Sequence, residues 1–253
     1  FRDCKTLESI TVDSENQMLL TDGSAVYFKT LFIFDGEEKE GLILEYYLPS
    51  KAQGKLTIKS NVGAIGAYAF YGCNKLEEVV AKDLEYVDSQ AFCNSSIKRF
   101  SAKGNYMIWD AAFRNCKNLE SINLENVEYI GVGAFENCTS LEDVTFSETI
   151  GEISELAFSN TGLKNVEIDI QKIPNSNLSK AKLDGVKLKG TLDGANIEET
   201  NFTGYVGDLI LNPQLIQNKS LCFTDINGLI VNGSFDGVNV HCMKTKGFKG
   251  EIT

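Results

Sequence analysis

Apolar positions recur along this chain at a nearly constant interval. The dipeptide Ala-Phe occurs five times, and its phenylalanines lie 22, 21, 22 and 23 residues apart, at Phe70, Phe92, Phe113, Phe135 and Phe158. A period in the low twenties is typical of a solenoid, in which each repeat is one short unit that stacks on its neighbours. The pattern therefore predicts a stack of similar coils with the phenylalanines in an internal ladder.

A second motif follows several of these phenylalanines at a fixed distance. After Phe135 come Cys138, Leu141, Val144 and Phe146, and the repeats of Phe70 and Phe113 keep this frame. Apolar and polar residues alternate at its end, which is typical of a half-buried strand. We therefore expect equivalent strands of successive coils to pair in a parallel sheet.

A second apolar cluster precedes each phenylalanine, for example Val127 and Ile130. We expect it to form a short extended or helical piece that carries the Ala-Phe dipeptide. Gly66 and Gly131 follow the isoleucine of their repeats. They suit a tight turn or a backbone position with positive φ.

These motifs resemble the BspA-like leucine-rich repeats, whose consensus is approximately I-G-x-x-A-F-x-x-C-x-x-L-x-x-I-x-L. Residues 65–76 read IGAYAFYGCNKL and match every fixed position. The resemblance implies an α/β-type, strand-dominated repeat solenoid, a right-handed coil with a parallel sheet on its concave face. Members of this family are largely surface proteins of host-associated bacteria and some anaerobic protozoa, and several act as adhesins.

We expect residues 1–253 to form one solenoid with four parts. Residues 1–12 read as a partial repeat, so we expect the natural protein to extend further toward its N-terminus. Residues 13–55 interrupt the period and carry Asp22-Gly23 and Asp35-Gly36, which are hairpin signals, so we predict a β-hairpin insert there. The regular repeats occupy 56–168, and 169–253 keep a divergent form of the same frame.

Composition narrows the possible partners. The formal net charge is −11, with 35 acidic against 24 basic residues, which argues against nucleic acid as a partner. No stretch is apolar enough for a membrane span. We expect the chain to be a monomer.

Four cysteines share one repeat position, namely Cys4, Cys73, Cys116 and Cys138. We expect a buried, reduced thiol at this position, and disulfides between adjacent coils are the alternative. Cys222 and Cys242 form the next most plausible pair.

Candidate catalytic and metal-binding groups are scarce. His241 is the only histidine. A metal site with two histidines is therefore excluded, and a Ser-His-Asp triad would have only this one residue as its base. The run Asp225-Ile226-Asn227-Gly228 has two oxygens of a calcium loop but lacks its terminal glutamate, and reads better as a turn. We expect no cofactor and no enzymatic activity.

The residues that alternate with the apolar positions of the strand point away from the core. On successive coils this set supplies the predicted ligand-binding residues of the concave face, which are Glu78, Arg99, Asn123, Asp143 and Glu167. Tyrosine and tryptophan mark interfaces when they are exposed. Tyr27, Tyr46 and Tyr47 of the insert form a second candidate site, with Trp109 as a further exposed-aromatic candidate.

Our interpretation is a recognition or adhesion module, extracellular or at a cell surface, that binds a host or matrix protein or a glycan. A structural spacer or stalk segment of a larger surface protein is the first alternative. An accessory that captures glycans for a separate degrading enzyme is the second.

Overall fold

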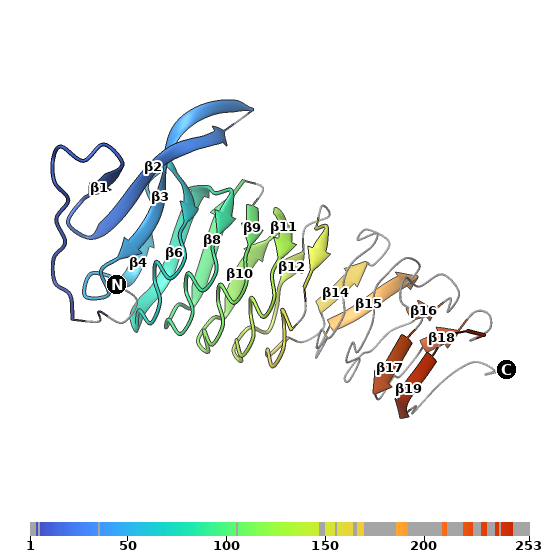
Figure 1. Cartoon of the computed structure of the whole chain (residues 1–253). Helices are drawn as coiled ribbons and strands as arrows, with labels where there is room; N and C mark the ends of the chain where they lie inside the picture. Colours follow the sequence, from blue (N-terminus) through green and yellow to red (C-terminus); the bar gives the residue numbers. More distant parts are fainter. Residues whose placement is uncertain are drawn as a thin grey trace.

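The computed structural model is a coil built from strands and turns (Figure 1). It describes residue 4, residues 6–34, 36–104, 106–146, 150–154 and 156–163, and further on residues 236–237 and the backbone of six strands. These described residues contain no helix, so the α/β label does not apply to them. The pieces that precede each phenylalanine form short strands and turns instead.

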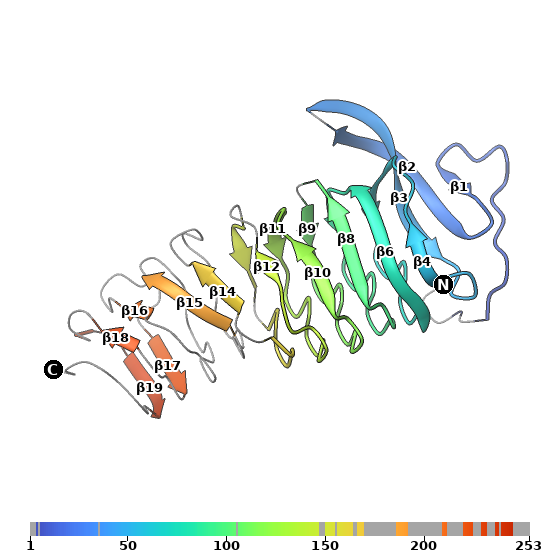
Figure 2. The same ribbon diagram turned by 180° about the vertical axis from the view of Figure 1, so that it is seen from behind.

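Two sheets of the described residues run along the coil, and Figures 1 and 2 show them from opposite sides. The five-stranded sheet has the order β12-β10-β8-β6-β4 and is parallel throughout. Its strands are β4 (Gln53–Thr57), β6 (Lys75–Asp83), β8 (Arg99–Lys103), β10 (Ser121–Leu124) and β12 (Thr145–Phe146).

The eight-stranded sheet has the order β1-β2-β3-β5-β7-β9-β11-β13 and is parallel from β3 onward. Its strands are β1 (Leu19–Thr21), β2 (Ala25–Phe34), β3 (Glu37–Tyr47), β5 (Val62–Ile65), β7 (Tyr86–Val87), β9 (Tyr106–Ile108), β11 (Val127–Ile130) and β13 (Glu152–Ile153). In the regular part, each coil therefore contributes one strand to each sheet.

The predicted phenylalanine ladder forms the core between the sheets. Phe92 stacks on Phe70 and on Phe113 with 4.9 Å between ring centroids, and the series continues through Phe135 to Phe158. All five rings are buried. Burial of each ring should contribute about 1.5–3 kcal/mol. Because each ring contacts the next, the coils stabilise one another.

Each coil turns at two backbone positions with positive φ. The first lies two residues before the phenylalanine, at Tyr68, Gln90, Ala111, Gly133 and Leu156. The second lies two residues after it, at Gly72, Asn94, Asn115, Asn137 and Asn160. Asparagine and glycine adopt this conformation most readily, which accounts for the second set.

Gly66 and Gly131 do not have the positive φ that we predicted as one option. Their coils leave little room for a side chain. A Cβ atom at Gly131 would lie 2.6 Å from Oδ1 of Asp110. At Gly66 the backbone oxygen of Leu44 would be 3.1 Å away. Close approach of the neighbouring coil therefore explains these glycines.

Residues 13–55 are not set apart from the solenoid. Strands β2 and β3 pair antiparallel over Ala25–Tyr47, and β1 pairs antiparallel with β2. However, β3 also pairs in parallel with β5 of the first regular coil. Tyr47 then stacks on Phe70 at 5.1 Å and extends the ladder by one ring. The segment thus supplies both a projecting pair of strands and the first layer of the core.

The partial repeat predicted at 1–12 does not form a regular coil in its described part. Residues 6–12 contain no strand, and Cys4 is exposed, whereas the matching cysteines are buried. Side chains hold this segment against the first layer instead. Ser50 Oγ donates to the carbonyl of Leu7 at 2.9 Å, and Tyr46 Oη donates to that of Cys4 at 3.4 Å.

Parallel pairing also occurs among the described strands of the divergent region. Strands β14 (Val166–Asp169), β15 (Val186–Thr191), β16 (Leu209–Leu211) and β18 (Leu229–Val231) form one sheet, and β17 (Ser220–Thr224) pairs with β19 (Asn239–Lys244). The remaining residues predicted for these coils lie outside the described residues.

Candidate functional site

The five-stranded sheet carries three of the five residues that we predicted for the concave face, Glu78, Arg99 and Asn123. Its register aligns Lys55 with Glu78, Glu78 with Arg99, and Arg99 with Ser121. These four residues form one row across β4, β6, β8 and β10, which we call the charged row. The structure therefore brings Glu78 and Arg99 together, as the strand frame predicted.

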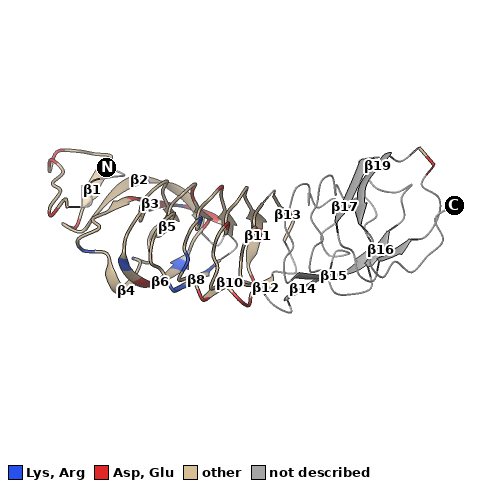
Figure 3. Cartoon of the chain, turned by 90° about the horizontal axis from the view of Figure 1, so that it is seen from below, with Lys and Arg blue, Asp and Glu red and all other residues tan. Residues whose placement is uncertain are grey.

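The charges of this row compensate one another. Glu78 accepts an ion pair from Lys55 at 2.7 Å and from Arg99 at 3.5 Å. The Lys55 ammonium, and then the Arg99 guanidinium, hold the pKa of Glu78 below its ordinary value against a smaller opposing effect of burial. In Figure 3, basic (blue) and acidic (red) positions lie on neighbouring strands of this sheet. Surface pairs of this kind contribute little to stability, so they remain available to a ligand.

Asn123 lies one row away from Arg99. Its register partner is Thr145, whereas Arg99 pairs with Ser121. The backbone N–H of Glu125 donates to Asn123 Oδ1 at 2.8 Å, and Tyr106 Oη donates to the Asn123 carbonyl at 2.7 Å. These bonds fix the amide at the surface. The predicted concave-face residues Arg99 and Asn123 therefore lie in two adjacent rows.

A shallow depression of about 330 Å³ lies between the two rows. Arg99, Ser121, Asn123 and Glu125 line its polar side. Glu125 was not among the predicted residues, because it lies just beyond the end of β10 and outside the alternating frame. Glu78, Ser101 and Thr145 also line it, so the depression offers a ligand one guanidinium, two carboxylates and four neutral polar side chains.

The other two predicted residues of this face are less fully placed. Asp143 is exposed and precedes Thr145 by two residues, so it continues the charged row after Ser121. Glu167 lies in β14, where its backbone aligns with Lys187. Its side chain lies outside the described residues.

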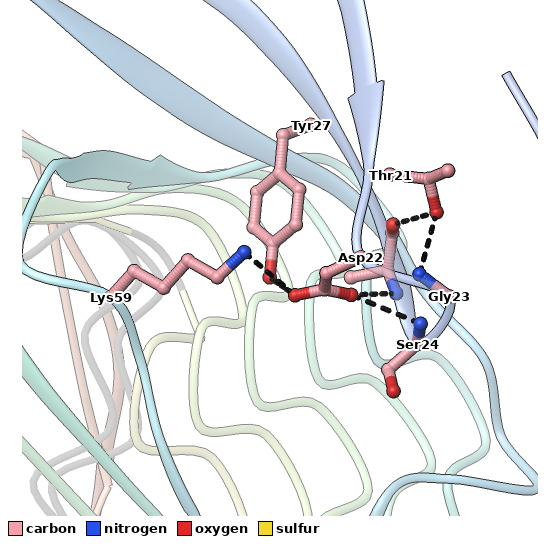
Figure 4. Close-up of polar contacts among 7 residues, drawn as sticks. Thr21, Asp22, Gly23, Ser24, Tyr27 and Lys59 are labelled. Carbon is pink, nitrogen blue, oxygen red and sulfur yellow. Dashed lines mark hydrogen bonds and ion pairs between the residues drawn. The ribbon is translucent and has the colours of Figure 1, made fainter. Parts of the chain in front are cut away.

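The secondary site predicted on the insert requires exposed aromatic rings, and this requirement is not met. Tyr27 and Tyr46 are buried, and Tyr47 is half-buried against Phe70. Tyr27 Oη donates to Asp22 Oδ2 at 2.8 Å, and the Lys59 ammonium lies 4.3 Å from the centre of its ring (Figure 4). The 23-residue step from Tyr47 to Phe70 equals a ladder step and could have revealed its position.

The buried thiols match the prediction for the regular repeats. Cys73, Cys116 and Cys138 are buried and form no disulfide, and Cys93 shares this state. Cys116 Sγ donates to the carbonyl of Phe92 at 3.0 Å, and Cys138 Sγ to that of Phe113 at 3.1 Å. The side chains of Cys222 and Cys242 lie outside the described residues, so their pairing stays a prediction.

Among the described residues, we find no group of three or more histidine, cysteine or carboxylate side chains that could hold a metal ion. The same residues include no helical segment with the length and hydrophobicity that a bilayer crossing requires.

The parallel strands, the 21 to 23-residue period and the cysteine and leucine positions define a leucine-rich repeat solenoid. The model of the BspA type leucine rich repeat region matches in six copies, over residues 43–126 and 106–227. These matches cover more than half of the chain, so the chain belongs to the BspA type leucine-rich repeat family.

Solved structures agree with this fold. The pneumococcal vaccine antigen PcpA superimposes with a TM-score of 0.54 and 17% identity, over 78% of this chain and 66% of that one. A leucine-rich repeat protein of T. pallidum, TpLRR, gives a TM-score of 0.50 and 20% identity, over 78% of this chain and 83% of that one. Among curated proteins, none matches this chain.

Proposed function

We propose that this chain is a non-enzymatic recognition module, extracellular or at a cell surface, which binds a protein partner through the five-stranded sheet. The observation that carries the proposal is the depression of about 330 Å³ between the charged row and Asn123. It presents polar groups of both signs on a rigid parallel sheet. Such a surface can match the mixed charges and amides of a folded protein or an extended segment.

Family and fold support this assignment. Solenoids of stacked repeats present extended surfaces that are used for binding. Solved relatives of the same fold include a protein described as a vaccine antigen, which fits a surface location. Adhesion to a host or matrix protein is the form of this function that we favour, and a bound glycan is the alternative ligand class.

The test uses a panel of immobilised matrix proteins and a glycan array, followed by a triple variant. Arg99→Ala, Asn123→Ala and Asp143→Ala together remove one positive charge, one amide and one negative charge from the sheet. A matched control, Arg114→Ala, Asn118→Ala and Glu136→Ala, removes the same groups from the turns. Arg114 and Glu136 form an ion pair of 2.9 Å there.

We expect the sheet variant to lose at least tenfold in affinity for the partner that the panel identifies, because a few central residues carry most of the binding energy. The control variant should bind as wild type does. Equal affinity of the two variants would place the binding site elsewhere. A panel without any saturable binding would favour the spacer function instead.

A further inference from the structure

The outward face of the eight-stranded sheet carries one continuous apolar row. The strand register aligns Leu19 with Phe28, Phe28 with Ile43, and Ile43 with Ala64. Each of these strands therefore contributes one apolar residue at the same level of the sheet.

The row continues across the regular coils. Ala64 aligns with Tyr86, Tyr86 with Met107, and Met107 with Tyr129, and Glu152 ends the row. Tyr86, Met107 and Tyr129 remain partly exposed, whereas Ala64 is fully buried between its larger neighbours in the row. Their neighbours along the strands, such as Val87 and Ile108, are fully buried, so the row points away from the core. We call these residues the outer row.

The two sheets thus present different chemistry. The five-stranded sheet presents the charged row of Lys55, Glu78 and Arg99 to solvent, beside the polar row of Asn123 and Thr145. The outer row is aromatic and aliphatic along most of its length. An exposed polar or charged residue at these positions would be equally compatible with the coil, so packing alone does not account for the apolar row.

Two further aromatic rings pack beside the outer row, the partly exposed Trp109 and the buried Phe32. Trp109 is 36% exposed, and its ring lies 5.2 Å from that of Tyr129. Phe32, on the projecting part of β2, lies 6.5 Å from Tyr86 and covers Gly63, where a Cβ atom would be 2.7 Å from its ring. Near β1, a depression of about 390 Å³ is lined by Leu19, Phe28, Tyr46 and Tyr68, with Glu45 at its side.

Carboxylates surround the centre of the outer row. Burial raises the pKa of Tyr86, and the nearby charges of Asp88, Glu45 and Glu85 raise it further. Burial, and then Asp88, raise the pKa of Glu45. In the part of the chain that the structure describes, no lysine or arginine forms an ion pair with these three carboxylates. Glu85 accepts a hydrogen bond from the backbone N–H of Ile33 at 2.8 Å.

We propose that the outer row is a second docking surface, which binds an extended segment of a partner protein that carries lysine or arginine among apolar side chains. Charge complementarity selects this occupant, because an apolar surface bordered by uncompensated carboxylates favours cations, which also interact with aromatic faces. A second copy of this chain fits poorly, since its net charge is −11. This surface is distinct from the one in the proposed function, so either can fail without the other.

The dimensions of the sheet set the length of the segment. Eight strands spaced by about 4.8 Å give a row of about 34 Å. A segment that rises about 3.3 Å per residue covers this distance with about ten residues. A peptide of that length with alternating lysine and leucine is therefore a suitable probe.

The experiment measures binding of this labelled lysine–leucine peptide to the full chain by fluorescence anisotropy. A glutamate–leucine peptide of equal length is the charge control. We expect saturable binding of the lysine–leucine peptide only, weakened several-fold between 50 and 300 mM salt because surface charges are screened. Absence of saturable binding, or equal binding of the glutamate–leucine peptide, would overturn the proposal.

Two pairs of variants locate the site. Glu45→Lys with Asp88→Lys should reduce affinity at least tenfold. Glu77→Lys with Glu120→Lys, on the five-stranded sheet, changes the net charge equally and should have a much smaller effect. If both pairs weaken binding equally, only the net charge of the protein attracts the peptide, and the proposal is wrong.

A second set tests the apolar part of the surface. Met107→Gln with Tyr129→Gln should reduce affinity at least tenfold, with folding checked by circular dichroism. If that variant does not fold, Trp109→Gln replaces it, because Trp109 is already partly exposed. Unchanged affinity in the folded variant would contradict the proposal. A dimer that light scattering detects in wild type but not in this variant would contradict the proposal too, because a second copy would then occupy this face.

Discussion

Asn137 donates its side-chain amide to Oδ1 of Asn115 at 2.9 Å, and both residues have positive φ, at 63° and 62°. The same bond joins Asn115 to Asn94 at 3.0 Å and Asn160 to Asn137 at 2.8 Å. At the first coil, Asn94 donates to Tyr71 Oη at 2.9 Å. One residue type thus satisfies two needs of the turn, the left-handed backbone and a hydrogen bond to the neighbouring coil.

Asn115 tests this asparagine ladder. Asn115→Ala removes two side-chain hydrogen bonds, each with a net contribution of about 1 kcal/mol. It also leaves an alanine in the left-handed backbone region. Alanine has no polar side chain to form a local hydrogen bond there, so this conformation costs about 1–2 kcal/mol. Together these contributions predict a loss of about 3–4 kcal/mol in the free energy of unfolding, measured by denaturant melts.

Asn115→Gly is the matched control, because it removes the amide but tolerates positive φ, as Gly72 does at the same position of the first coil. It should lose less than the alanine variant. If both variants lose less than about 0.5 kcal/mol, the ladder has no energetic role.

Phe113 tests the core ladder. Its ring lies 4.9 Å from Phe92 and 5.4 Å from Phe135. Phe113→Ala leaves a cavity between two stacked rings and should cost about 3–5 kcal/mol in denaturant melts. Phe113→Leu keeps most of the volume and should cost less than about 1.5 kcal/mol. A loss below about 1 kcal/mol for the alanine variant would contradict the ladder as the main source of stability.

The sequence alone predicts those parts of the molecule that its period repeats. Phe113, Cys116 and Leu119 fall at fixed steps, and each is buried as expected. The sequence places Tyr47 in an insert because the residues around it follow no repeat. Its step to Phe70, however, has the length of a repeat. The period predicts each regular coil from the preceding one, but it does not show where an irregular segment joins the stack.

The pairing register between strands of neighbouring coils explains most of what the sequence does not predict. The outer row joins residues of different types, such as Met107 and Tyr129, and a register shift between Val127 and Tyr129 hides it from a fixed spacing. Arg99 and Asn123 both alternate with apolar positions, but Arg99 aligns with Ser121 and Asn123 with Thr145, so the two residues belong to adjacent rows. The asparagines at the turns are visible in the sequence, whereas their amide bonds depend on the distance between coils.

The buried thiols predict a specific dependence on pH. Burial raises the pKa of Cys73 and of Cys116 to about 12, and that of Cys138 well above its ordinary value. The unfolded chain loses these protons near pH 8.5, so between about pH 9 and 12 the unfolded state binds fewer protons than the folded state. Stability should therefore fall as the pH rises through this window.

Cys116→Ala isolates this effect from the tyrosines that titrate in the same range. The slope of unfolding free energy against pH should become shallower by up to about 1.4 kcal/mol per pH unit in this variant. Thiol labelling gives an independent measurement. The native protein should label Cys4 quickly and the four buried thiols only after unfolding. Rapid labelling of Cys116 in the native state would contradict its burial.

Asp22 predicts the opposite dependence at acid pH. Burial raises the pKa of Asp22, but hydrogen bonds from Lys59, from the N–H groups of Ser24 and Ala25, and from Tyr27 outweigh it and lower the pKa to about 2 (Figure 4). A lowered pKa stabilises the fold above the unfolded value near 3.9, and the contribution is lost as the pH falls toward 2. Because water screens this surface turn, we expect about 1 kcal/mol.

Asp22→Asn is the variant that checks this effect. Its amide oxygen can take the place of Oδ1 and still accept from the N–H groups of Ser24 and Ala25. Its NH2 group takes the place of Oδ2, where it can only donate to Tyr27 Oη and cannot pair with the Lys59 ammonium, which lies 2.8 Å from Oδ2 in wild type. The variant should be less stable than wild type by about 1 kcal/mol at pH 7, and the difference should shrink at pH 3 and close near pH 2. Lys59→Gln should reproduce the part of the loss that comes from the ion pair. A stability difference that stays constant from pH 7 to pH 2 would show that Asp22 acts through the geometry of its turn and not through its charge.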